Sequence, residues 1–417
     1  MYEVVCVGAG LSGCVCAYLL AKAGVRVGLV EKKLFPRTKI CGGGLSEKAC
    51  QLIGEIVDLD TIPGRRILGS YLCFNNEHLC HISKKISGYS IRRDDLDYAL
   101  LNAAKSQACD IYMPAEVINI QEKNSKVTIT LKDGNQIESK FLIIAEGATG
   151  NLHKQVGYFG NHEWTMALEV DVFPKTFPRV FYNNTVLDFG FFKKGYGWIF
   201  PKDDRINMGA YFYYSPRIHL SQIKALELFV KEFQWANDGK IGKIKGYPLP
   251  YRIDYPAFNT NRTLLVGDVT GSAENLFGQG LYYAFLTSQL AAETLIGSLN
   301  NASLDSYTKK LKSKILSQIR VSRVMARHFY HHQRFGYYNM ARNKWMNSFY
   351  SNLIQGRVTQ KKALIYTIIS LPFFFLSPYF EDIDFSEINR CRDKTMKPVS
   401  VNNSRIDIGK SELGVGC

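Results

Sequence analysis

The hydrophobic pattern of residues 2–31 predicts a β-strand, an α-helix and a second β-strand. The run "YEVVCVGAG" is short and apolar and ends in glycines, "LSGCVCAYLLAKAG" has helical periodicity, and "VRVGLVEKK" is again apolar. A strand that enters a helix through glycines is typical of the first βαβ unit of a nucleotide-binding sheet. The chain therefore begins as an α/β protein.

Further patterns extend this fold. Residues 92–108, "RRDDLDYALLNAAKSQA", predict a helix with acids in its first turn, and residues 115–147 predict strands joined by a turn at Asp133–Gly134. Residues 164–215 are rich in aromatic side chains and contain several strand-like runs. Residues 262–271, "RTLLVGDVTG", predict a short buried strand, which a helix follows from about Gly280.

Composition adds bounds on size and compartment. A chain of 417 residues, 46% of them hydrophobic, can form a large core and at least two structural units. Its ten cysteines are scattered without zinc-binding spacing, so we predict no metal site. The N-terminal segment "MYEVVCVGAG" lacks the basic start of a signal peptide. A reduced, cytosolic chain is the simplest interpretation.

The net charge of +15 is concentrated near the C-terminus. Between residues 301 and 362 there are thirteen Lys or Arg residues against one acid, Asp305. The apolar run 363–380 that follows has 18 residues, is broken by Pro372 and Pro378, and falls short of the roughly 20 needed to span a bilayer. This combination predicts peripheral contact with an anionic membrane surface, not nucleic-acid binding. A spanning segment and a buried C-terminal helix are the alternatives.

The first candidate site is the glycine turn at residues 8–13, "GAGLSG", with Glu31 at the end of the next strand. Gly8, Gly10 and Gly13 permit a tight turn and a close approach of a pyrophosphate to the helix N-terminus. Glu31 can accept hydrogen bonds from a ribose. The motif predicts dinucleotide binding but does not separate NAD from FAD.

A second block, "LLVGDVTGSAENLFGQGLYYAF", favours FAD. Asp268 follows a strand and can bind a ribityl hydroxyl group. The helix that Gly280 opens can direct its positive end at a flavin edge that becomes negative on reduction.

With these blocks, the chain resembles the FAD-dependent family that includes p-hydroxybenzoate hydroxylase, and within it the geranylgeranyl reductases, which saturate prenyl chains. The resemblance covers roughly residues 1–300. It implies an α/β fold in which a Rossmann-like FAD-binding domain interleaves with an α+β substrate domain built on an antiparallel sheet. The implied FAD-binding domain comprises residues 1–68, 88–155 and 255–300, the substrate domain 69–87 and 156–254, and the basic helical C-terminal region 301–417.

The resemblance also implies roles for single residues. "CGGGL", residues 41–45, matches a loop whose backbone approaches the flavin, and Arg93 of "RRDDLD" matches an arginine that reaches the cofactor. The full implied cofactor-binding set is Gly8, Gly10, Ser12, Gly13, Glu31, Gly42, Gly43, Gly44, Leu45, Arg93, Val117, Asp268, Gly280 and Leu281. Arg93 as a solvated partner of Asp94 or Asp97, and Val117 as a plain strand residue, are the alternatives. The family's Asp-Gly at the second strand end is Glu146-Gly147 here, which leaves any NAD(P)H contact of that loop open.

The stretch "GYGWIFPK", residues 195–202, resembles the aromatic-W-x-F-P motif of prenyl reductases. Tyr196, Trp198 and Phe200 would form an apolar tunnel for an isoprenoid chain, because such a chain offers no hydrogen-bonding groups and aromatic rings supply large buried areas. The alternative is that these rings are ordinary sheet core.

The predicted reaction is reduction of an isoprenoid C=C bond by hydride from reduced FAD, with a proton delivered to the other carbon. The resemblance places Cys41 near the substrate, beside the flavin ring, and whether it donates the proton, shapes the pocket or does neither stays open. NADH, NADPH or ferredoxin could supply the electrons. An ether lipid, a chlorophyll precursor or a quinone could carry the chain. A FAD-dependent monooxygenase, epoxidase or halogenase, and a non-catalytic flavoprotein, are the rival functions.

Overall fold

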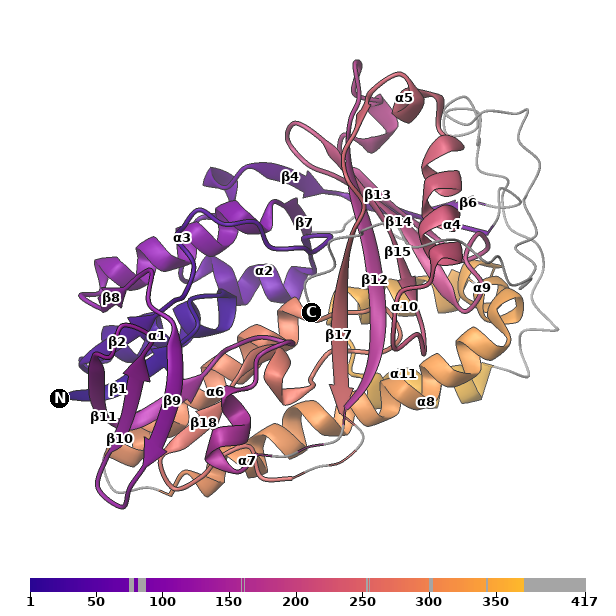
Figure 1. The fold of residues 1–417 in the computed structure, drawn as a ribbon. Helices are drawn as coiled ribbons and strands as arrows, with labels where there is room; N and C mark the ends of the chain where they lie inside the picture. The colour runs from indigo at the N-terminus through magenta and orange to yellow at the C-terminus, as the bar shows by residue number, and fades with distance from the viewer. Residues whose placement is uncertain are drawn as a thin grey trace.

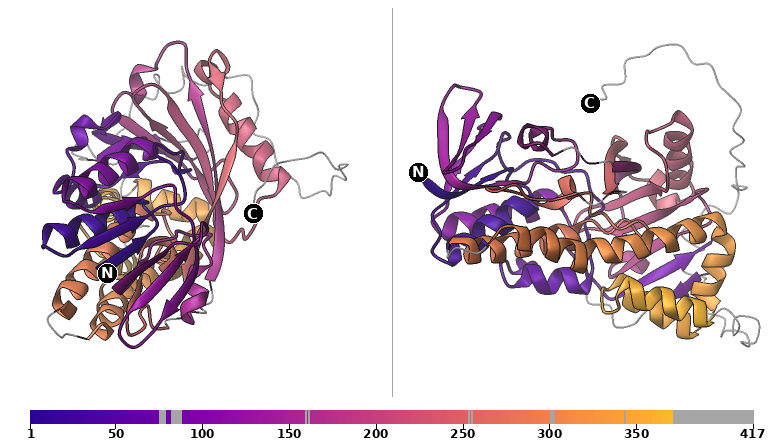
Figure 2. Two further views of the ribbon diagram at one scale, coloured as in Figure 1. Left: turned by 60° about the vertical axis from the view of Figure 1, so that its left-hand side comes forward. Right: turned by 90° about the horizontal axis from the view of Figure 1, so that it is seen from below.

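The computed structural model describes residues 1–370, except 75–78, 82–87, 159, 161, 253, 255, 300–302 and 343. Two large β-sheets lie next to each other, and helices from the last part of the chain run beneath both of them (Figure 1). The view from below shows these C-terminal helices crossing the length of the molecule (Figure 2).

The first sheet has the strand order β8-β2-β1-β11-β10-β9, and β18 also pairs with β11. The pairs among β8, β2, β1, β11 and β18 are parallel, whereas β9 and β10 are antiparallel. Val4, Val5 and Cys6 are completely buried, which explains the continuous apolar runs in this part of the sequence. The strands are β1 (Tyr2–Val7), β2 (Val27–Val30), β8 (Asp110–Tyr112), β9 (Val117–Glu122), β10 (Val127–Leu131), β11 (Gln136–Ile144) and β18 (Thr263–Leu265).

Helices pack against this sheet, with α1 in contact with both α3 and α6. The glycine turn of the sequence joins β1 to α1, and the helix expected from about Gly280 is α6. A small sheet of order β3-β7-β4 lies beyond α2. The elements are α1 (Leu11–Lys22), β3 (Gly44–Leu45), α2 (Glu47–Gly54), η1 (Leu59–Thr61), β4 (Gly64–Ile67), β7 (Gly88–Ile91), α3 (Arg93–Ser106), η2 (Leu152–Val156), η4 (Gly267–Thr270) and α6 (Leu281–Leu299).

The second sheet has the order β16-β12-β15-β14-β13-β5-β6, with β17 also paired to β12. Its pairs are antiparallel except β13–β5. Side chains of α4 and α5 cover one face, in a core that includes Phe229 and Trp235. The elements are β5 (Gly69–Cys73), β6 (Leu79–His81), β12 (His162–Phe173), η3 (Arg179–Phe181), β13 (Asn184–Asp188), β14 (Gly195–Pro201), β15 (Ile206–Phe212), α4 (Leu220–Lys231), α5 (Gln234–Asn237), β16 (Lys240–Ile241) and β17 (Lys245–Arg252).

The described part of the basic C-terminal region is integral to the core. Tyr307 and Ile315 pack into the core of the first sheet, whereas Phe329 and Tyr350 pack with residues of the second sheet on the face opposite α4. Charge on the outer surface of these helices is therefore compatible with an apolar inner surface. The elements are α7 (Asp305–Leu311), the π-helical segment η5 (Lys312–Leu316), α8 (Ser317–His331), α9 (Gln333–Arg342), α10 (Lys344–Ile354) and α11 (Gln360–Ser370).

The apolar run 363–380 begins in α11, and residues 371–380 lie outside the described residues. Ala363 is completely buried, whereas Ile365, Tyr366 and Ile368 are 57%, 51% and 58% exposed. Among the helices that the structure describes, none combines the length and the hydropathy that crossing a bilayer requires.

Candidate functional site

A cavity of about 870 Å³ collects the predicted site residues from both sheets. Every one of them except Gly13 lines it: Gly8, Gly10, Ser12, Glu31, Cys41, Gly42, Gly43, Gly44, Leu45, Arg93, Val117, Tyr196, Trp198, Phe200, Asp268, Gly280 and Leu281. Segments that are far apart in the sequence therefore meet at one site.

The first glycine turn is packed so tightly that side chains are excluded. A Cβ atom on Gly8, whose φ is +101°, would lie 2.4 Å from the carbonyl oxygen of Ala145. A Cβ atom on Gly13 would lie 1.8 Å from the carbonyl oxygen of Gly8, so Gly13 does not line the cavity but permits the close packing of the turn. Gly10 is the N-cap of α1 and has no side chain to cap it, so the first N–H groups of the helix are available to an anion.

Glu31 is held at the rim of the same cavity. Its side chain is buried, and its two carboxylate oxygens accept hydrogen bonds from the backbone N–H groups of Ala9 and Lys33, both at 2.9 Å. Arg37 lies 3.9 Å away. These contacts fix the carboxylate where a dinucleotide ribose would lie beyond the glycine turn.

The CGGG loop is equally confined. A Cβ atom on Gly43, whose φ is +69°, would lie 2.1 Å from the carbonyl oxygen of Ile91, and one on Gly44 would lie 3.0 Å from the Phe200 ring. Buried Lys202 holds the loop, since its ammonium group donates to the carbonyl oxygens of Gly42 and Ile91. Burial lowers the pKa of Lys202 to about 8.

Lys202 also donates to the hydroxyl group of Ser90 at 3.0 Å. The three acceptors of this ammonium group are thus neutral oxygens from the CGGG loop and from β7. We conclude that Lys202 ties the end of β14 to the loop that faces the cavity.

Arg93 is paired with Asp97, as one alternative anticipated, but the pair is buried and not solvated. The guanidinium group donates two hydrogen bonds to one oxygen of Asp97, at 3.1 and 2.9 Å. Its pKa is raised by the charge of Asp97 and by the neighbouring Cys41 thiol, although burial opposes this. Asp97 also lies 3.5 Å from Arg37. Arg93 is therefore a fixed positive charge beside Cys41 on the cavity wall.

The aromatic residues of β14 form one wall of the cavity. The ring centroids of Tyr196 and Trp198 are 6.3 Å apart, and those of Trp198 and Phe200 are 6.1 Å apart. The indole N–H of Trp198 donates to Asn207 at 2.8 Å, and the hydroxyl group of Tyr196 donates to the carbonyl oxygen of Phe277 at 2.6 Å. Because the polar atoms are satisfied elsewhere, this wall can bind a hydrocarbon chain with its ring carbons.

Tyrosine hydroxyl groups fix the loop before α6. Those of Tyr211, Tyr330 and Tyr196 donate to the carbonyl oxygens of three successive residues, 275, 276 and 277, at 2.8, 2.6 and 2.6 Å. The same loop is held from within by Glu274, which accepts the N–H groups of residues 276 and 277 at 2.7 and 2.8 Å. A rigid loop here positions the N-terminus of α6.

That N-terminus is open on the cavity side. A Cβ atom built on Gly280 would have only an Asp268 carboxylate oxygen nearby, at 4.0 Å, which leaves room for a bound group. The side chain of Gln279 donates to the carbonyl oxygen of Ile354 at 2.8 Å, and Ile354 and Gln355 also line the cavity. The C-terminal helices therefore contribute to the site.

Glu146 stands where the resembled family has an aspartate, and its local contacts explain the glutamate. Its carboxylate accepts hydrogen bonds from the N–H groups of Leu152 and His153 at 2.7 and 3.0 Å and contacts the His153 ring at 2.5 Å. Glu146 thus caps η2 at the rim of the cavity. Because both carboxylate oxygens of Glu146 are engaged by residues 152 and 153, a role of the family's Asp-Gly loop cannot be assigned to Glu146 from the resemblance alone.

Sequence reasoning missed several lining residues, among them Glu169, Tyr211 and Tyr247. Glu169 is partly buried on β12, and burial, aided by the nearby Asp171, raises its pKa to about 7. The signal that could have found it is the alternation of "EWTMALEVDVF", in which Leu168 and Val170 face the opposite side of the strand.

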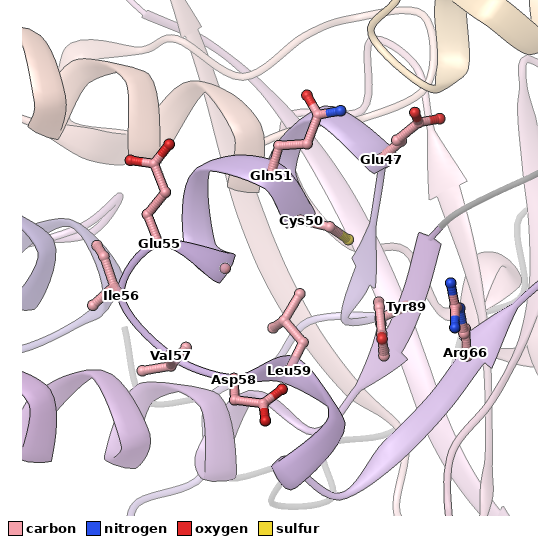
Figure 3. Close-up of a pocket in the computed structure, with 11 residues that line it drawn as sticks. Glu47, Cys50, Gln51, Glu55, Ile56, Val57, Asp58, Leu59, Arg66 and Tyr89 are labelled. Carbon is pink, nitrogen blue, oxygen red and sulfur yellow. The ribbon is translucent and has the colours of Figure 1, made fainter.

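A second, shallower hollow of about 550 Å³ lies beside α2 and contains none of the predicted site residues (Figure 3). Cys50, Glu47 and Tyr89 line it. Burial raises the pKa of the Cys50 thiol to about 12, so this group is not a nucleophile at neutral pH.

In the described part of the chain, no cluster of three or more His, Cys, Asp or Glu side chains is placed to hold a metal ion. The cysteines whose side chains are described form no disulfide bond.

Comparison with known proteins gives distant relatives along most of the chain. The family model "Lycopene cyclase protein" matches residues 3–182. An uncharacterised protein of Methanosarcina barkeri is 28% identical over 340 residues, 79% of this chain and 84% of its own. A geranylgeranyl diphosphate reductase of Synechocystis is 25% identical over 360 residues, covering 79% and 85%. A menaquinone reductase of Mycobacterium tuberculosis is 25% identical over 323 residues, covering 70% and 76%.

Solved structures share the fold. A geranylgeranyl bacteriochlorophyll reductase-like protein from Thermoplasma acidophilum has a TM-score of 0.72 at 18% identity, covering 90% of this chain and 98% of its own. The flavin-dependent brominase Bmp2 has a TM-score of 0.71 at 20% identity, covering 85% and 93%.

The fold is shared with flavin-dependent enzymes, and the glycine-lined cavity is of the kind that binds FAD. The sequence relatives include geranylgeranyl diphosphate reductases, and a solved structure with the same fold is a geranylgeranyl bacteriochlorophyll reductase-like protein, so the chain is similar to reductases of this kind. The site fits FAD, because the tight turn at Gly8, the carboxylate of Glu31 and the open N-terminus of α6 line one cavity.

Proposed function

We propose that the chain reduces C=C bonds in the isoprenoid chain of a lipid or prenylated precursor, with FAD as its cofactor. The observation that carries this proposal is the wall formed by Tyr196, Trp198 and Phe200, which shares a cavity with the CGGG loop. A substrate held against this wall lies in the same enclosed space as the cofactor-binding loops.

The residues of the chain divide the work as follows. When bound, FAD supplies hydride transfer. The aromatic wall binds and orients the hydrocarbon and excludes water, since its polar ring atoms are already hydrogen-bonded within the protein. Lys202 and the Gly43 turn keep the CGGG loop in place. Cys41 lies beside Arg93 on the cavity wall, and its role stays a prediction.

Mass spectrometry of products tests this function. The protein, with FAD and a chemical reductant under argon, should convert a panel of prenylated ether lipids, quinones and diphosphates to products heavier by two hydrogens per reduced bond. A monooxygenase, epoxidase or halogenase would stall without oxygen and turn over when oxygen is admitted. A non-catalytic flavoprotein would bind lipid without reoxidation of its flavin. Either result would overturn the proposal.

The physiological electron donor is proposed to be NAD(P)H or ferredoxin. Each candidate can be offered in turn to the oxidised protein under argon. Bleaching of the flavin absorbance near 450 nm would identify the donor. Failure of all of them to bleach a flavin that dithionite reduces would remove these donors from the proposal.

We further propose that the chain approaches its substrate at an anionic membrane surface. The support is the basic composition of residues 301–362 and the exposed apolar residues Ile365, Tyr366 and Ile368 on α11. Co-sedimentation with vesicles of phosphatidylglycerol should exceed that with phosphatidylcholine and fall with salt. The double variant Ile365→Glu/Ile368→Glu should bind less, and unchanged binding would contradict this surface.

A further inference from the structure

Glu169 has a position that no predicted role explains. In the register of the second sheet, Glu169 lies opposite Gly209, and Gly209 lies opposite Trp198. The three residues form one row across β12, β15 and β14, so their side-chain positions point to the same face of the sheet. That face is the wall of the cavity, and Glu169 lines it.

The glycine in the middle of this row brings the other two side chains together. A Cβ atom on Gly209 would lie 2.1 Å from Cζ2 of Trp198, so the indole ring occupies the space above Gly209. The ring therefore leans across β15 toward the row position of Glu169. The carboxyl group stands beside the part of the wall that we assign to the hydrocarbon chain.

The opposite side of this carboxyl group faces the cofactor loop. The backbone N–H of Cys41 and the side chain of Asn207 are hydrogen-bonding neighbours of Glu169. Cys41 opens the CGGG loop, and Asn207 is the residue that accepts from the Trp198 indole. Glu169 is thus located between the CGGG loop and the aromatic wall.

From this placement we propose that Glu169 is the acid that delivers the proton to the alkene during reduction. The inference rests on the proposed function and adds a residue to it. The π bond of the alkene breaks, and one carbon receives the hydride that reduced FAD supplies. The other carbon forms its C–H bond with the carboxyl proton of Glu169, whose O–H bond breaks. The carboxylate regains a proton from water, and NAD(P)H or reduced ferredoxin restores the two electrons.

The charged neighbours of Glu169 agree with this role. Burial and, to a lesser extent, Asp171, two residues along the same strand, raise its pKa to about 7, whereas Lys202 at the end of β14 opposes them. Arg205 compensates Asp171 at 3.2 Å, and Lys245, opposite Glu169 on β17, is exposed. Near neutral pH the group can therefore both hold and release a proton, as an acid catalyst must.

Glu169→Gln is the test variant, and Glu163→Gln is its matched control. Glu163 lies on the same strand and the same face but pairs with Arg323 and does not line the cavity. We expect Glu169→Gln to lower the rate of prenyl reduction at least 100-fold, with FAD content and lipid binding unchanged, and Glu169→Asp to restore part of it. Glu163→Gln should keep the wild-type rate.

The pH dependence gives a second readout. Because the protonated form is the active one, the wild-type rate should fall about tenfold per pH unit above pH 7, and the residual rate of Glu169→Gln should lack this fall. Infrared difference spectra of the protein without substrate should show a protonated-carboxyl band that disappears near pH 7. The band should be missing in Glu169→Gln and present in Glu163→Gln.

The outcomes separate this inference from the proposed function. If the wild-type protein saturates no prenyl lipid, the proposed function fails and the role of Glu169 fails with it. If the wild type is active and Glu169→Gln retains its rate and pH profile, only the role of Glu169 is overturned. An infrared band that disappears near pH 4.5, or a 100-fold loss in Cys41→Ala but not in Glu169→Gln, would overturn it as well.

Discussion

The two faces of the second sheet are both rich in aromatic residues but are built for different purposes. On β14, Gly197 and Ile199 face α4, where a Cβ atom on Gly197 would lie 2.7 Å from the Phe192 ring. Tyr196 and Trp198, on the other face, border the cavity and direct their polar ring atoms into hydrogen bonds. Aromatic content alone therefore does not indicate a ligand wall. The hydrogen bonds that join the cavity face to neighbouring loops, from Tyr196 to Phe277 and from Lys202 to Gly42, do.

Removal of one large ring from each face should give the largest contrast. Phe229 is completely buried between the sheet and α4, so Phe229→Ala should lower the free energy of unfolding by about 3–5 kcal/mol. Trp198→Ala should lower it by less, because one side of the ring already faces the cavity, and should weaken prenyl-lipid affinity at least tenfold. Urea denaturation and lipid titration measure the two effects. Equal stability losses with equal lipid affinities would contradict the contrast.

Lys202 follows the cavity-facing residues of β14, and its lowered pKa should make the free energy of unfolding depend on pH. Its pKa is lowered to about 8, so between pH 8 and 10.5 the unfolded chain holds a proton that the folded chain has lost. Stability from this group therefore rises with pH across that window, by up to about 3 kcal/mol. The difference in unfolding free energy between the wild type and Lys202→Met should show this rise. A flat difference would mean that Lys202 is not desolvated.

Gly197 and Gly209 lie on opposite faces of the second sheet, so a substitution at either one overpacks one face only. Gly197→Ala crowds the Phe192 and Phe229 rings, and Gly209→Ala crowds the Trp198 ring. Each substitution should cost about 1–3 kcal/mol of stability in urea. Lipid binding should weaken in Gly209→Ala and remain at the wild-type level in Gly197→Ala. Weakened lipid binding in Gly197→Ala alone would reverse the assignment of the faces.

The smallest effect is expected at Glu163, which lies on the same face of β12 as Glu169 but outside the cavity. Glu163 pairs with Arg323 at 2.9 and 3.0 Å, and both side chains are about one-third exposed. Glu163→Gln should therefore change the unfolding free energy by less than about 1 kcal/mol. A double-mutant cycle with Arg323→Gln isolates the pair, and a coupling above about 2 kcal/mol would show that the pair is shielded from water.

Local chemistry explains which parts of the fold and site were predictable. The turn at Gly8 and the alternation of β14 carry their signals within a few residues, and the structure places both on the cavity. Glu169 and Lys202 were missed because each depends on contacts with segments that are distant in the sequence. Pairing among β12, β15 and β14 sets the position of Glu169, and hydrogen bonds to Gly42 and Ile91 set that of Lys202. The alternation of β12 separates its two faces, but it does not indicate which face meets the CGGG loop.

The C-terminal helices were predicted, but their packing into both cores was missed for a different reason. Their basic composition suggested a separate surface region, yet α8 buries residues at helical spacing, among them Met325, Phe329 and Tyr330. Arg320 and Arg327 of the same helix are exposed. A high net charge on an amphipathic helix describes its outer side only, and it gives no information about what the inner side contacts.

The hydrogen bonds from Tyr330 to residue 276 and from Gln279 to Ile354 have a practical consequence. A polypeptide shortened to its first 300 residues would lose two supports of the loop at the α6 N-terminus along with any membrane affinity. Loss of turnover in such a fragment would therefore say nothing about lipid attachment. Trimming after Ser370 keeps both supports and also keeps Ile365, Tyr366 and Ile368, so it tests only what residues 371–417 add to attachment, and the substitutions on α11 test the rest.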